Sequence, residues 1–197
     1  MAETHRRIAP LAAIALLPVV AGVLESQSPP PGARTTETYA SAAIDSSGDL
    51  VIVTSGGRRV AVRKERDQTS YSAPLLSPPK NAVGAQAMFG NCCTSYDIPL
   101  KLVVYVAGKA HRFVGAGLPI YRWAFADSGR RVAYAQEPLH FACETHYELR
   151  DIESERLVDS ADIPQPCGQR PNPASVPIPQ WVADLLARPT PSQGSPR

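Results

Sequence analysis

The stretch that decides the fold is IYRWAFADSGRRVAYAQ, residues 120–136. Two runs of strand-forming residues, 120–126 and 130–136, flank the turn-forming triplet DSG. Strands joined by so short a turn must be antiparallel, because a parallel crossover needs a dozen or more residues. Trp123 and Phe125 lie two positions apart, so they share one face of the first predicted strand. We therefore expect an antiparallel hairpin with both aromatic rings in the core.

Short runs of the same kind occupy most of the chain on either side of this hairpin. Turn-forming Gly, Pro, Asn, Asp and Ser residues separate them. The predicted strands are 41–44, 50–54, 58–63, 71–76, 82–89, 100–106, 112–114, 120–126, 130–136, 146–151 and 157–160. The prediction is an all-β domain of antiparallel meanders in about three blade-like sheets, either an incomplete propeller or a sandwich. One short C-terminal helix completes it.

Part of this pattern resembles a known repeat. WAFADSGRRVAY at 123–134, followed by YELRD at 147–151, resembles one blade of a TolB-type β-propeller, and residues 43–52 and 76–84 resemble weaker copies. Propellers usually need at least four blades to close a ring, and this chain supplies three at most. The resemblance implies an open fragment, a compact sandwich or a ring completed across subunits. It brings no catalytic residue with it.

A second resemblance concerns NCCTSYDIPLKLVVY, residues 91–105. This segment is similar to a stretch in small exported, uncharacterised bacterial proteins. That similarity implies export and carries no activity.

The N-terminus has the pattern of a secretory leader. Basic residues precede an apolar run over 8–24, and Val19-Val20-Ala21 offers a small-residue cleavage site. We expect cleavage after Ala21 and a periplasmic or secreted product with no membrane span; an uncleaved anchor is the alternative. The expected organisation is a signal peptide at 1–21, a disordered linker at 22–38, an all-β domain at 39–163, a Pro-rich tail with a short helix at 164–188, and disorder at 189–197.

Charge argues against a nucleic-acid partner. The chain carries 20 Lys and Arg against 18 Asp and Glu, whereas a polyanion site needs a basic face. The one basic concentration comprises Arg58, Arg59, Arg63, Lys64 and Arg66. We interpret it as a solvated strand face with Glu65 and Asp67 as local partners.

Four cysteines in an exported chain predict disulfides. We favour Cys143 with Cys167, and Cys92 with its neighbour Cys93 as the remainder; the neighbours can also take separate partners. The first bridge would pin the tail to the sheet. A loop of this length predicts a contribution on the order of 3 kcal/mol.

One segment has the composition of a metal site. His140, Cys143 and His146 recur every third residue, and zinc accepts imidazole and thiolate ligands. On an extended strand this spacing alternates faces, so the three converge only in a loop or turn, which Pro138 allows. A disulfide at Cys143 would remove its thiolate.

The tail contains the candidate helix. In QWVADLLA, residues 180–187, Trp181 and Leu185 fall on one side, with Val182 and Leu186 beside them. We expect this helix to dock on the sheet, because isolated helices this short are marginal in water. Display on a Pro-rich stalk for a partner is the alternative.

Two function classes follow. The first is a non-catalytic envelope or extracellular module that binds a protein or glycan partner without a cofactor. The alternative is a zinc-dependent hydrolase at His140, Cys143 and His146, or a thiol-redox protein at Cys92 and Cys93.

Overall fold

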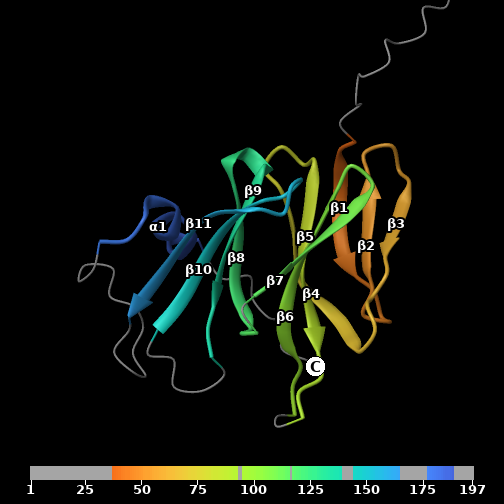
Figure 1. The fold of residues 1–197 in the computed structure, drawn as a ribbon. Coiled ribbons are helices and arrows are strands. Elements are labelled where there is room, and N and C mark those ends of the chain that lie inside the picture. Colours follow the sequence, from red (N-terminus) through yellow and green to blue (C-terminus); the bar gives the residue numbers. More distant parts are fainter. Residues whose placement is uncertain (1–36, 93–94, 116, 139–143, 165–176, 189–197) are drawn as a thin grey trace, which may run out of the picture. The chain divides into compact units, whose positions relative to one another are not determined.

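The computed structural model describes residues 37–92, 95–115, 117–138, 144–164 and 177–188. Eleven strands and one α-helix lie in these ranges (Figure 1). The strands are β1 (Tyr39–Ile44), β2 (Leu50–Thr54), β3 (Arg59–Val62), β4 (Gln68–Leu76), β5 (Ala82–Phe89), β6 (Ile98–Val106), β7 (Lys109–Val114), β8 (Ile120–Ala126), β9 (Arg131–Gln136), β10 (Glu144–Asp151) and β11 (Leu157–Pro164); the helix is α1 (Gln180–Ala187). The predicted leader and most of the linker lie outside the described residues.

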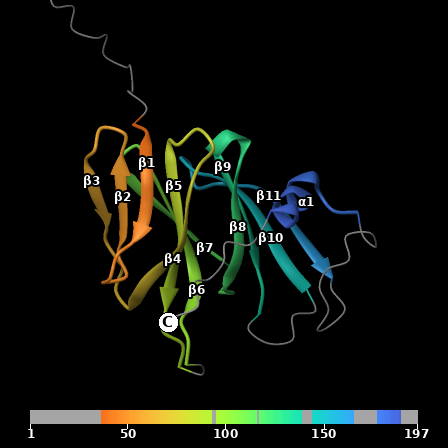
Figure 2. The ribbon, with the colours of Figure 1, turned by 180° about the vertical axis from the view of Figure 1, so that it is seen from behind.

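The strands form three antiparallel sheets. The first sheet has the order β1-β2-β3, the middle sheet β4-β5-β6-β7, and the third sheet β11-β10-β9-β8. Every pairing is between neighbours in the sequence and antiparallel. Figures 1 and 2 show the three sheets as separate groups of strands. The predicted all-β class is confirmed, and the arrangement is compatible with part of a propeller.

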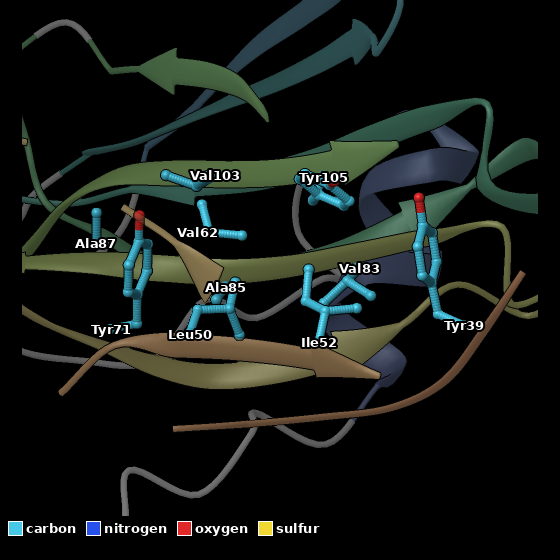
Figure 3. Packing of buried hydrophobic residues seen from close by; sticks show 10 residues of the cluster. All are labelled: Tyr39, Leu50, Ile52, Val62, Tyr71, Val83, Ala85, Ala87, Val103 and Tyr105. Atoms are coloured by element: carbon cyan, nitrogen blue, oxygen red, sulfur yellow. The ribbon is translucent and has the colours of Figure 1, made fainter. Parts of the chain in front are cut away.

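The first sheet packs on one face of the middle sheet. Leu50 and Ile52 of β2 meet Val83, Ala85 and other side chains of the middle sheet in one buried cluster (Figure 3). At one end of this cluster, the Tyr39 and Tyr105 rings make an edge contact with their centroids 5.8 Å apart. Alternation along the strands places these residues inward.

The middle sheet also packs on the third sheet through its other face. Leu102 and Val104 of β6 contact a cluster that includes Trp123, Phe125 and Tyr134 of the third sheet. Because both faces of the middle sheet are covered, seven of the eight residues of β5 are buried. This strand therefore lacks the apolar and polar alternation of a half-exposed strand.

Helix α1 covers the outer face of the third sheet. Val182 and Leu185 are buried against Ala124, Ala133 and Leu149. The predicted docking is confirmed. Of the described residues, no helix is long and apolar enough to cross a bilayer.

The DSG triplet forms the predicted turn between β8 and β9. Asp127 and Ser128 both have positive φ angles, followed by Gly129 at φ 83°. A Cβ atom on Gly129 would lie 2.9 Å from the Ser77 Cβ atom. Glycine is required here by backbone conformation and by the close approach of the β4–β5 turn.

Several boundaries and contacts differ from the sequence expectations. Six strands are longer than predicted, because polar residues such as Gln68 and Asp162 also pair across the ladder. Tyr96 is 57% exposed in the loop between β5 and β6. Glu65 pairs with Lys101 and Arg112 of the middle sheet instead of with its basic neighbours.

Candidate functional site

The residues proposed from the sequence lie largely outside the described part of the chain. His140, Cys93, Cys143 and Cys167 fall in ranges that the structure does not describe. Cys92 lies on the surface. The zinc trio and both disulfide pairings therefore stay predictions. Within the described residues, no group of three or more His, Cys, Asp or Glu side chains is arranged to hold a metal.

His146, the described member of the trio, is held between two carboxylates. It lies on β10 opposite Asp162 of β11. Its Nδ1 atom is 2.5 Å from Asp162 Oδ1, and its Nε2 atom is 3.2 Å from Glu148 Oε1. Partial burial lowers the pKa of His146, but the two carboxylates raise it more, so the net pKa is raised. Both ring nitrogens of His146 therefore lie against carboxylate oxygens, which favour its protonated form.

Glu148 continues this network into the interior. Its Oε2 atom accepts hydrogen bonds of 2.5 Å from the Tyr134 hydroxyl and from Arg150 Nε. Burial raises the pKa of Glu148, but these donors outweigh it and the net pKa is lowered. Burial and then the adjacent carboxylate raise the pKa of Tyr134. The network is an ionised carboxylate with both oxygens occupied, which fastens β9 to β10.

A groove opens between the end of β4 and the edge of β8. Its volume is about 250 Å³. The residues that line it are mainly apolar and come from β4, the turn after β4, β8 and the position just after α1: Leu75, Leu76, Pro78, Trp123, Ala124, Phe125 and Arg188. We call this the β8 groove.

An irregularity in β4 shapes the first wall of the β8 groove. The register with β5 shifts between Ser72 and Leu75. Ala73 in this interval has a φ of 50°, and Pro74, which has no N–H to donate, follows it. Bulges of this kind bend a strand and redirect its side chains. The shift sets the direction of Leu75 at the groove.

Trp123 also lines the β8 groove, and its indole packs against Gly84. A Cβ atom at Gly84 would lie 2.4 Å from Trp123 Cη2 and 2.6 Å from Cζ3. Trp123 and Phe125 meet edge to face with ring centroids 5.4 Å apart. Trp123 Nε1 is buried and has no hydrogen-bond partner within the described residues. The missing side chain at Gly84 is what lets the indole pack this deeply.

Arg188 supplies the cation at the rim of the β8 groove. Its Nη1 atom donates a 2.8 Å hydrogen bond to the Phe125 carbonyl oxygen. The side chain is exposed, and no carboxylate pairs with it in the part of the chain that the structure describes. A guanidinium has five N–H donors, so most of them remain available.

A second, smaller hollow shares Ala124, Phe125 and Arg188 with the β8 groove. It has a volume of about 120 Å³ and is lined by Trp181 and Leu185 of α1 as well as by Arg188. Asp127 and Asp184 also line it. Asp127 is already paired with Arg131 at 2.7 Å. The two hollows therefore differ in charge, and the β8 groove is the one with a cation and no acidic lining residue.

The sequence pattern predicts part of this site. Trp123 and Phe125 are expected in the core, and they are 2% and 4% exposed. Arg188 is only the last residue before the expected disorder, and no pattern gives Gly84 a role. Pro74 inside a strand was the available signal of an irregular edge.

Comparison with known proteins does not show a family for this chain. The sequence matches no protein-family model and no curated protein. An acylaminoacyl peptidase from Pyrococcus horikoshii has a TM-score of 0.40 and 12% identity over 65% of this chain and 25% of its own. Hydrazine synthase from Kuenenia stuttgartiensis has a TM-score of 0.40 and 13% identity over 66% of this chain and 34% of its own. The chain spans about a third or less of these structures, and likeness at this level assigns no function.

Proposed function

We propose that this chain is an exported, non-catalytic binding module of the cell envelope or the extracellular space, and that it binds through the β8 groove. The observation that carries the proposal is an apolar hollow of about 250 Å³ with one cation at its rim. Ligand sites are typically concave, mostly apolar and supplied with a few convergent polar groups.

The placement of the β8 groove supports this proposal. Binding sites on rigid elements hold their geometry better than sites on loops. Trp123 and Phe125 belong to β8, which is paired with β9 along its length and covered by α1 on its outer face. The resemblance of residues 123–134 to a TolB-type blade also supports our proposal that the sheets act as a scaffold.

The polar network of His146 supports a structural role for the titratable groups. A general base needs a lone pair within reach of its substrate. In the network both oxygens of Glu148 accept hydrogen bonds, and His146 lies between Glu148 and Asp162.

A titration with 1-anilinonaphthalene-8-sulfonate, an apolar anion, tests the β8 groove. Purified wild type should bind the dye saturably at one site, with an enhanced dye signal. Pro78→Phe fills the rim at an exposed position and should abolish that signal, whereas Pro79→Phe places the same ring one residue away from the lining as a control. Equal dye binding by the two variants would refute binding in the groove.

The export part of the proposal is tested separately. The full chain is expressed with its own N-terminus in a Gram-negative host, and the periplasmic product is weighed intact. A product that begins at Gly22 supports export. Full-length protein retained in the cytosol contradicts it.

A further inference from the structure

We infer that the β8 groove takes an aliphatic carboxylate, with its chain against Leu75, Trp123 and Phe125 and its carboxylate on Arg188. This inference rests on the proposed function and adds the chemical class of the ligand. Two observations carry it: the apolar lining of the groove and the difference in charge between the two hollows.

The apolar part sets the size of the ligand. A dry cavity of roughly 150 Å³ holds one benzene ring. The β8 groove measures about 250 Å³, and its lining includes Leu75 and Leu76 together with the nearly buried Trp123 and Phe125. A chain of roughly eight carbons matches this space on the same scale.

Charge selects an anion. Arg188 uses one donor on the Phe125 carbonyl, and its exposed guanidinium can bind a carboxylate through two parallel hydrogen bonds. Asp127 and Asp184 line the neighbouring hollow, which shares Phe125 and Arg188 with the β8 groove. The lining of the β8 groove itself contains no acidic residue, so an anion is less repelled there than in the neighbouring hollow.

Trp123 provides the readout. The chain has two tryptophans, and both line these hollows, Trp123 the β8 groove and Trp181 the other. Trp181→Phe leaves Trp123 as the single tryptophan of the chain. In this background, the emission of Trp123 is titrated with octanoate and, as the matched neutral probe, with 1-octanol.

We expect octanoate to bind at least about tenfold more tightly than octanol, because charge-assisted hydrogen bonds are the strong ones. Arg188→Gln should bring octanoate to the level of octanol, and Arg188→Lys should keep part of the preference. Arg156→Gln, an exposed arginine in the β10–β11 turn, is the control and should change nothing. Thermal unfolding of each variant verifies that the fold is retained.

The outcomes separate the two levels of the proposal. Equal binding of octanoate and octanol by the wild type overturns carboxylate recognition and leaves the binding module standing. Binding of neither probe overturns both. N-acetyl-Leu-Leu with a free carboxylate is the third probe, and tighter binding of this peptide than of octanoate would overturn the aliphatic ligand in favour of a protein C-terminus.

Discussion

Gly84→Ala tests how the wall of the β8 groove is built. The added Cβ atom would lie 2.4 Å from Trp123 Cη2 and 3.3 Å from Phe125 Cζ. Carbon atoms in contact are normally about 3.5–4.0 Å apart, so the indole must retreat by roughly 1 Å. Trp123 has little room, because it is 2% exposed and packs edge to face on Phe125.

The expected magnitude follows from two opposing effects. Overpacking a filled core costs typically about 1–3 kcal/mol. Replacing glycine by alanine restricts the unfolded chain and returns about 0.4–1 kcal/mol. We therefore expect the free energy of unfolding to fall by about 1–2 kcal/mol, which for a chain of this length lowers the Tm by about 3–6 °C.

Urea unfolding followed by far-ultraviolet circular dichroism measures this change, and Trp123 emission in the Trp181→Phe background reports the movement of the indole. Gly56→Ala is the control, since the nearest atom to its added Cβ, Thr54 Oγ1, is 3.9 Å away. Gly84→Ala with wild-type stability and unshifted emission would refute the argument that this glycine exists for the tryptophan.

Three further predictions concern the third sheet. Because the pKa of His146 is raised in the folded protein, its contribution to stability is present below pH 6.5 and is lost as pH rises through the raised pKa. His146→Gln should remove this part of the dependence of Tm on pH. Tyr134→Phe should lower the free energy of unfolding by about 1–3 kcal/mol, because the buried Glu148 loses one donor; urea midpoints measure it. Leu185→Ala should cost about 2–5 kcal/mol by opening a cavity under α1, and undiminished stability would contradict docking of the helix.

The strands were predictable because each depends on local pattern. Alternating side chains and short turns identify β8 and β9 with no information from elsewhere in the chain. Helix α1 was predictable for the same reason, since Trp181 and Leu185 fall on one side within eight residues. The local sequence specifies these elements, and tertiary contacts only extend their ends.

The β8 groove was not predictable from such patterns. Arg188 and the Phe125 carbonyl are 63 residues apart in the chain, and no periodicity links them. The approach of Trp123 to Gly84 likewise depends on how the middle and third sheets stack. The polar network was predictable in part. His146, Glu148 and Arg150 alternate along β10 and share a face, but their partner Tyr134 comes from β9.

The packing of α1 bears on whether further copies could complete a ring of sheets. Stacking another sheet at each end would require both outer faces of this stack. On the third sheet, Ala124, Ala133 and Leu149 are already buried beneath Val182 and Leu185, and the same atoms cannot pack against a second sheet while α1 is docked. On the first sheet, the outward side chains of β1–β3 alternate with the buried ones and are exposed or half-buried. A ring closed through the third sheet therefore requires α1 to leave that sheet. If the three stacked sheets were part of such a ring, Leu185→Ala, which weakens the docking of α1, would favour assembly of several copies.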